Sequence, residues 1–162
     1  MKFLIKTILF LTFISIKCVA QNPAQTIPQF NFTKLDGSVF SNKDLKQGKL
    51  LFFVFFDAEC DHCQHAITYI NEHFSDFKKA ATYLITLDNK DKLKNFMNKY
   101  GNNLQDKKSV TILLDTKNDF IAKFHPRKYP SLFLYSSPRQ LIMYDDNEKN
   151  LLNFSMKING KN

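Results

Sequence analysis

An uninterrupted run of apolar residues, Leu50 to Phe56, lies in the first half of the chain. Such a run is typical of a strand that is buried on both faces of a sheet. Beyond it, apolar residues recur at spacings of about three and four, at Ala66, Ile67, Tyr69, Ile70 and Phe74. This periodicity predicts an amphipathic helix that begins at Cys60 and runs to about Phe77, with a kink or break near Ser75 and Asp76. The chain therefore leads from a central strand almost directly into a helix.

The rest of the chain alternates between strand and helix patterns. Residues 28–39 predict a β-hairpin with its turn at Asp36-Gly37, and Ser41 is expected to cap a short helical turn. Further strands are expected at 82–87, 110–114, 131–135 and 141–144, and further helices at 90–100, 118–124 and 148–156. We expect Asp88 to cap the helix at 90–100 and Gly101 to end it. This alternation, which includes a late hairpin, predicts an α/β sandwich of three layers around a mixed central sheet, with helices on both faces.

The first twenty residues have the layout of a cleavable secretory signal. Lys2 and Lys6 precede a short apolar run, and cleavage is expected near Ala20. The run is too short to span a bilayer, which takes about 20 apolar residues. Lipid attachment at Cys18 is disfavoured, because Lys17 stands where such processing needs a small residue. We therefore expect an exported protein that resides in the periplasm or the cell envelope.

Length and charge after cleavage indicate one domain without a nucleic-acid function. The chain of 162 residues would keep 142, which suits a single domain with a sizeable core. We divide it into a signal peptide at 1–20, a flexible lead-in at 21–27, one domain at 28–156 and a C-terminal tail at 157–162. The formal net charge of +8 falls to +5, because the signal carries three lysines. The remaining lysines are dispersed, which favours solubility over binding to nucleic acid or a membrane surface.

Two cysteines remain after cleavage, Cys60 and Cys63, and both stand at the start of the predicted helix. The unpaired backbone N–H groups and the positive dipole end of a helix stabilise a thiolate in its first turn. A single close pair does not build a disulfide scaffold, and a chain of this size does not need one. The Cys-x-x-Cys spacing at this place therefore indicates a redox-active pair.

Several features occur together along the chain: a buried strand, the sequence Cys60-Asp61-His62-Cys63 at a helix start, a β-α-β unit, and Tyr129-Pro130 before a strand and a hairpin. This combination resembles the thioredoxin superfamily. The leading hairpin, the export signal and the stretch 115–124 are similar to the exported redoxins of the TlpA and ResA type. The resemblance extends from about Ile27 to the last helix, and it implies a thioredoxin-like fold with an N-terminal β-hairpin.

The resemblance also implies a function, that of a thiol-disulfide oxidoreductase acting on protein thiols and disulfides without a bound cofactor. Cys60 would attack a substrate disulfide, and Cys63 would resolve the mixed disulfide. Pro130 would be a cis-proline that faces the pair, and Tyr129 would bind an extended substrate through its backbone. A membrane or periplasmic electron donor or acceptor is implied as well. We expect a monomer, and the sequence leaves open whether it reduces, oxidises or isomerises its substrate.

Residues around the pair depart from the superfamily pattern. Glu59 stands where most members have Trp, and Asp61-His62 replaces Gly-Pro or Pro-Pro. Negative charge at Asp57, Glu59 and Asp61 disfavours a thiolate, whereas His62 and the helix end favour it. We expect these four residues to tune the redox potential, in a direction that their opposing effects do not decide.

Proton transfer needs another group as well. Val54 occupies the position, six residues before the nucleophile, where thioredoxins have a buried acid. The candidates that remain are Asp57, Glu59, His65 and water.

A metal-binding protein is the main alternative. Cys60 and Cys63, with His62, His65 or His125, are ligand types that suit Cu(I) or Zn(II). Copper chaperones with a thioredoxin fold have three residues between their cysteines, however, and structural zinc takes four ligands, whereas this chain offers two thiolates. We therefore predict no metal site.

A peroxiredoxin-like antioxidant is a weaker alternative. The peroxide site of that family needs Thr or Ser three positions before the nucleophile and Pro further upstream. Those positions hold Asp57 and Phe53. The sequence thus favours disulfide exchange over peroxide reduction.

Overall fold

The computed structural model describes residues 22–161. The expected signal segment, with Cys18 and the cleavage position near Ala20, lies outside the described residues. Within residues 22–161, every helix is too short or too polar to cross a bilayer.

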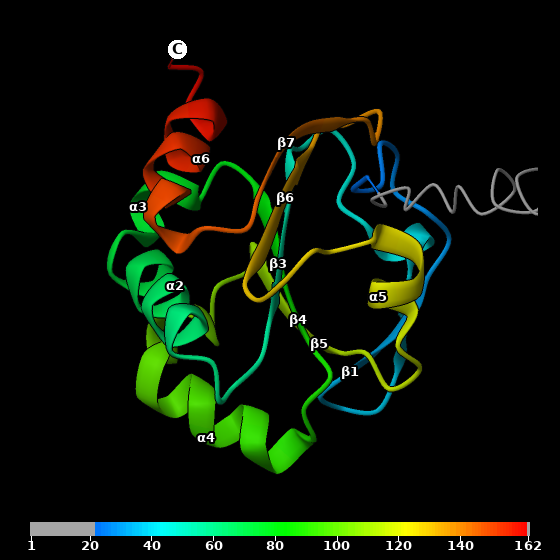
Figure 1. The fold of residues 1–162 in the computed structure, drawn as a ribbon, viewed down its shortest axis with the longest axis vertical. Helices are drawn as coiled ribbons and strands as arrows, with labels where there is room; N and C mark the ends of the chain where they lie inside the picture. Colours follow the sequence, from blue (N-terminus) through cyan, green and yellow to red (C-terminus); the bar gives the residue numbers. More distant parts are fainter. Residues whose placement is uncertain (1–21, 162) are drawn as a thin grey trace, which may run out of the picture.

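The described residues form a three-layer α/β sandwich, as the sequence pattern predicts. The strands are β1 (Asn31–Lys34), β2 (Val39–Ser41), β3 (Leu51–Phe56), β4 (Ala81–Thr86), β5 (Val110–Leu114), β6 (Ser131–Tyr135) and β7 (Leu141–Asp145). The α-helices are α2 (Asp61–Glu72), α3 (Phe74–Phe77), α4 (Lys90–Tyr100), α5 (Asp119–Phe124) and α6 (Leu151–Ile158), and the 3-10 turns are η1 (Asn42–Asp44), η2 (Asn102–Leu104) and η3 (Glu148–Asn150). One mixed sheet has the order β2-β1-β5-β4-β3-β6-β7. Figure 1 shows α2, α3, α4 and α6 on one side of this sheet and α5 on the other.

Strand β3 lies inside the sheet and is buried along its whole length. It pairs in parallel with β4 and antiparallel with β6. Its side chains alternate between two apolar cores, because successive residues of a strand point to opposite faces. Phe52 packs against Phe154 of α6 with ring centroids 5.4 Å apart, while Phe55 stacks on Phe120 of α5 at 4.5 Å. Packing on both faces fixes the carboxyl end of β3, where the cysteine loop begins.

The predicted N-terminal hairpin is confirmed. Strands β1 and β2 pair antiparallel with Phe32 opposite Phe40, and Gly37 adopts a positive φ of 87° in the turn, which suits a residue without Cβ. Ser41 and Asp44 form a capping box around η1. Strand β1 then joins the main sheet by pairing antiparallel with β5.

The segment before the hairpin, to which the pattern assigns no element, is hydrogen-bonded to the domain. The Ile27 N–H donates to the Arg139 carbonyl at 3.1 Å, and the Leu141 N–H donates to the Gln25 carbonyl at 2.7 Å. Thr26 also forms an isolated antiparallel β-bridge with Gln140. The contacts of the domain therefore begin upstream of residue 28.

The helix that begins after Cys60 is interrupted earlier than expected. The break lies at His73, between α2 and α3, and not near residues 75 and 76. The His73 backbone N–H donates to the Tyr69 carbonyl at 2.9 Å, and its ring stacks on the Tyr69 ring with centroids 4.2 Å apart. These contacts close the last turn of α2 around His73.

The cap of α4 also differs from the prediction. The Lys92 N–H donates to Asn89 Oδ1 at 2.9 Å, so Asn89 caps the helix. Asp88, the expected cap, points instead toward the loop after β3 and accepts the Ala58 N–H at 2.8 Å. Gly101 ends α4 as predicted. The last helix continues to Ile158, two residues beyond the expected end at 156.

Candidate active site

The candidate site lies at the carboxyl end of β3, where a short loop leads into α2. Cys60 is the N-cap residue of α2 and is partly exposed. Its carbonyl accepts the Cys63 and Gln64 N–H groups, both at 3.0 Å, so it begins the helical hydrogen-bond pattern. The Cys60 side chain therefore lies beside the positive end of the helix dipole, as the sequence predicts.

Cys63 is one turn further into α2 and fully buried. The Asp57 backbone N–H donates to Cys63 Sγ at 3.5 Å. Burial raises the pKa of the Cys63 thiol far above its usual value, and hydrogen bonding with Cys60 together with the negative charge of Asp57 adds to the increase. No disulfide bond joins Cys60 and Cys63 in the structure. The pair thus combines one accessible sulfur with one shielded, protonated sulfur.

Tyr129 and Pro130 lie against the cysteine pair, because β6 runs antiparallel to β3 and begins beside its end. The Tyr129-Pro130 peptide bond is cis. The Cys60 Sγ lies 3.9 Å from the Tyr129 carbonyl oxygen. These observations agree with the predicted cis geometry and with its closeness to Cys60.

A cavity of about 240 Å³ opens next to Tyr129. It is lined by Phe55, Ile121, Pro126, Arg127, Lys128 and Tyr129. The Tyr129 ring packs on Phe55 with centroids 4.9 Å apart. Burial, aided by the charges of Asp57 and Asp88, raises the pKa of Tyr129 to about 12, so its hydroxyl is neutral at physiological pH. The cavity offers a mostly apolar wall beside Tyr129, the residue whose carbonyl oxygen lies near Cys60 Sγ.

The acidic residues around the pair lie in different environments. Asp57 is half-buried, and its Oδ1 accepts the Glu59 N–H at 2.7 Å. Glu59 is 82% exposed and forms an ion pair with Lys92 at 3.2 Å. Asp61 is exposed in the first turn of α2. Of these three acidic residues, Asp57 is therefore the one that contacts the buried Cys63 sulfur, through its backbone N–H.

Asp88 is a site residue that the sequence analysis placed in a different role. Its side chain is only 7% exposed, and it accepts hydrogen bonds from Ala58 N–H and Thr86 Oγ1, both at 2.8 Å. It also pairs with Lys92 at 2.6 Å. The signal that points to this role is its position two residues after the end of β4, since parallel neighbouring strands end at the same edge of a sheet. Asp88 thereby holds the loop that carries Cys60.

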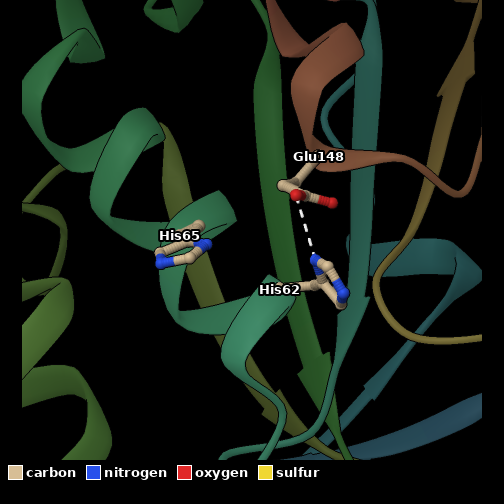
Figure 2. Close-up of side chains that lie close together, drawn as sticks. All are labelled: His62, His65 and Glu148. Carbon is tan, nitrogen blue, oxygen red and sulfur yellow. Dashed lines mark hydrogen bonds and ion pairs between the residues drawn. The ribbon is translucent and has the colours of Figure 1, made fainter.

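His62, between the two cysteines, is paired with a residue from the far end of the chain. Its Nδ1 lies 3.0 Å from Glu148 Oε1, as Figure 2 shows. The side chain of His62 is 68% exposed, and that of Glu148 is 11% exposed. Although burial raises the pKa of Glu148, the hydrogen bond from His62 and a backbone hydrogen bond lower it overall. No local pattern indicates this contact, because the two residues are 86 positions apart.

The structure separates the histidines that were considered as metal ligands. His65 joins His62 and Glu148 in a group whose ligand atoms all lie within 4.8 Å of one another. His125 does not belong to this group, and its Nε2 lies 3.1 Å from the Ala122 carbonyl oxygen. Within residues 22–161, neither cysteine belongs to a group of three or more metal-ligating side chains. The structure therefore gives no support to a metal site built on the cysteine pair.

Comparison with known proteins identifies the family. The model of the AhpC/TSA family matches residues 23–148. The chain belongs to the AhpC/TSA family. Together with the fold, this match confirms the thioredoxin-superfamily redoxin that the sequence resembles.

Relatives of this AhpC/TSA member include named redox proteins. The thiol-disulfide oxidoreductase ResA of Bacillus thuringiensis (strain Al Hakam) is 36% identical over 118 residues. The aligned part covers 71% of this chain and 64% of the relative, so the chain spans less than two thirds of that relative's length.

Solved structures of two proteins from Mycobacterium tuberculosis share the fold. A secreted disulfide oxidoreductase homologous to E. coli DsbE has a TM-score of 0.65 at 20% identity and covers 80% of this chain and 96% of its own. The peroxidoxin BcpB has a TM-score of 0.67 at 12% identity and covers 85% of this chain and 96% of its own. Because both match about equally well, the fold does not distinguish disulfide exchange from peroxide reduction.

Proposed function

We propose that this redoxin is an exported thiol-disulfide oxidoreductase that exchanges disulfides with protein substrates through Cys60 and Cys63. The main support is the asymmetry of the pair, since Cys60 is accessible at the start of α2 whereas Cys63 is fully buried one turn away. An exposed attacking thiolate and a shielded resolving thiol are what a two-step exchange requires. The name of the 36% identical relative, a thiol-disulfide oxidoreductase, agrees with this assignment.

The reaction proceeds in two balanced steps. The Cys60 thiolate attacks one sulfur of a substrate disulfide, and the other substrate sulfur leaves as a thiolate and takes up a proton. Cys63, after losing its proton, attacks Cys60 Sγ and closes the Cys60–Cys63 disulfide, which releases the second substrate thiol. The substrate gains two electrons, and the protein loses two. The same steps in reverse oxidise a substrate dithiol.

Resolution needs a base, because burial keeps the pKa of Cys63 high. We assign this role to the half-buried carboxylate of Asp57, whose negative charge acts on the Cys63 thiol. Glu59 is exposed and paired with Lys92, and His65 lies in the group with His62 and Glu148. Asp57→Asn should slow resolution about a hundredfold while leaving the first attack by Cys60 unchanged.

Stopped-flow measurement of mixed-disulfide formation and decay separates these two steps. Glu59→Gln is the matched control, since it removes a negative charge that is nearer to both cysteines in sequence but is exposed to solvent. Equal decay rates for Asp57→Asn and the wild type would refute the role of Asp57 as the base.

Substrate binding is expected along Tyr129 and the cavity beside it. The Tyr129 carbonyl lies 3.9 Å from Cys60 Sγ, so an extended peptide that follows this backbone would pass next to the attacking sulfur. The mostly apolar lining from Phe55 and Ile121 suits an apolar side chain near the substrate cysteine. This arrangement suits a disulfide within a protein chain.

Export after cleavage near Ala20 would place the protein in the periplasm or the cell envelope. Such a location requires an electron donor or acceptor in the membrane or the periplasm to reset the pair. The secreted state of the structurally similar oxidoreductase from Mycobacterium tuberculosis is consistent with this proposal.

Trapping of the mixed disulfide tests the proposed function. Cys63→Ser should accumulate a covalent complex with insulin or another substrate that contains a disulfide, because the resolving sulfur is missing. Cys60→Ser should lose insulin reduction, and the double variant Cys60→Ser/Cys63→Ser should trap nothing. Non-reducing electrophoresis and mass spectrometry read out the complex. Equal insulin reduction by Cys60→Ser and the wild type would refute the assignment.

A further inference from the structure

Two histidines on α2 and a glutamate at the start of η3 converge on one surface position beside the cysteine loop (Figure 2). We propose that His62, His65 and Glu148 form a binding site for a divalent transition-metal ion of the zinc type. This site is separate from the cysteine pair and does not depend on the proposed exchange reaction. It also differs from the metal site considered from the sequence, which used the cysteine sulfurs.

The spacing of the ligand atoms suits such an ion. Zinc–ligand bonds of about 2.0–2.1 Å place neighbouring ligands of a tetrahedral site roughly 3.3 Å apart. His62 Nδ1 and Glu148 Oε1 are already 3.0 Å apart, and all three ligand atoms lie within 4.8 Å of one another. His62 and His65 are both exposed, so rotation of their side chains can close the remaining gap without disturbing the core.

The local fold holds the ligands in place. His62 and His65 are three residues apart on one helix, a spacing that puts side chains on the same face. Glu148 is 11% exposed and lies at the N-terminus of η3, where Asn147 Oδ1 accepts the Lys149 N–H at 3.1 Å. A metal ion here would therefore connect the first two turns of α2 to the start of the C-terminal helical segment.

The donor set selects the class of ion. Imidazole nitrogens suit Zn, Cu and Ni, and one carboxylate is a common third ligand. Three protein ligands leave a coordination position open, and a cavity of about 320 Å³ borders His62 and Glu148. Lys128 and Lys149 also line this cavity, and Lys128 is paired with Asp146 at 3.5 Å. We therefore expect a site of modest affinity with room for water or an anion as the fourth ligand.

Calorimetric titration with Zn²⁺ alone tests the site in the Cys60→Ser/Cys63→Ser background, which removes thiolate ligands. One ion should bind per chain. His65→Ala and Glu148→Gln should each weaken binding by about tenfold or more, because losing a ligand costs at least as much as losing an outer-shell partner. His73→Ala, which removes an exposed histidine at the far end of α2, is the matched control and should bind like its parent.

A second measurement covers the case in which the cysteine background does not fold. Co²⁺ added to the reduced wild type should give weak d–d bands without intense thiolate-to-metal charge-transfer absorption. Zn²⁺ should also raise the unfolding temperature of the wild type, and this increase should disappear in His65→Ala. The proposal is overturned if His65→Ala and Glu148→Gln bind Zn²⁺ like their parent, or if strong charge transfer shows that the sulfurs hold the ion.

Discussion

Asp88 offers a sharp test of how the fold positions Cys60. In Asp88→Ala, the Ala58 N–H and the Thr86 hydroxyl would lose their acceptor, and Lys92 would lose the closer of its two carboxylate partners. Hydrogen bonds to a charged group contribute about 1.5–3 kcal/mol each and are not additive. Because the Asp88 side chain is 7% exposed, we expect the free energy of unfolding to fall by about 3 kcal/mol.

Urea unfolding at pH 7, followed by far-UV circular dichroism, measures this change. With an m-value of about 2 kcal/mol/M, the midpoint should fall by about 1.5 M urea. Asp91→Asn is the matched control, since Asp91 is exposed in the first turn of the same helix and should change stability by less than about 0.5 kcal/mol. Because Ala58 lies two residues before Cys60, the disulfide-exchange rate of Asp88→Ala should fall as well.

The contribution of Asp88 should also depend on pH. Burial raises its pKa, but hydrogen bonds from Lys92, Ala58 and Thr86 lower it overall. A carboxylate whose pKa is lower in the folded than in the unfolded state stabilises the fold above the unfolded value of about 4, and this stability is lost as the pH falls through the folded pKa. Asp88→Asn should therefore lose less stability than the wild type below pH 4. Parallel acid-unfolding curves for the two proteins, or an unchanged midpoint in Asp88→Ala, would refute the role of Asp88.

Three further substitutions test the core and the site. Thr82 Oγ1 is buried without a hydrogen-bond partner among the described residues, so Thr82→Val should raise the free energy of unfolding by about 1 kcal/mol in urea titrations; a decrease would show that the hydroxyl is satisfied in solution. Phe124 is fully buried, and its ring stacks on Phe120 with centroids 4.2 Å apart. Phe124→Ala should therefore lower the free energy of unfolding by about 3–5 kcal/mol, measured in the same way, and a decrease below about 1 kcal/mol would contradict this packing. Tyr129→Phe should leave the pH–rate profile of exchange unchanged up to about pH 10, because the pKa of Tyr129 is raised to about 12; a shifted alkaline limb would contradict this.

Much of the fold could be predicted from the pattern of apolar residues, because the central strand is buried on both faces of the sheet. The seven-residue run at 50–56 is typical of a strand covered on two faces, and β3 has that environment. The Cys-x-x-Cys spacing likewise places Cys60 at the partly exposed N-cap of α2 and Cys63 on the buried face of that helix. Local sequence periodicity was sufficient to predict these features, because the burial of one residue in a strand or helix determines which nearby residues are also buried.

The features that the sequence did not predict depend on contacts between distant or competing groups. Asp88 and Asn89 are both residue types that cap helices well. Asn89 caps α4, because the Asp88 carboxylate instead accepts the Ala58 N–H and pairs with Lys92. The break at His73 depends on its stacking against Tyr69, which apolar periodicity does not record. The pairing of His62 with Glu148 joins residues 86 positions apart, so only the folded chain brings it about.

The redox equilibrium of the Cys60–Cys63 pair tests the central proposal most directly. Purified protein is equilibrated with glutathione or dithiothreitol buffers of graded potential, quenched with acid, alkylated and analysed by mass spectrometry. The proposed function predicts that the pair closes reversibly as a two-electron couple, with a midpoint between that of a reductase, about −270 mV, and that of an oxidant, about −120 mV. A pair that stays reduced at every potential would contradict disulfide exchange by this protein.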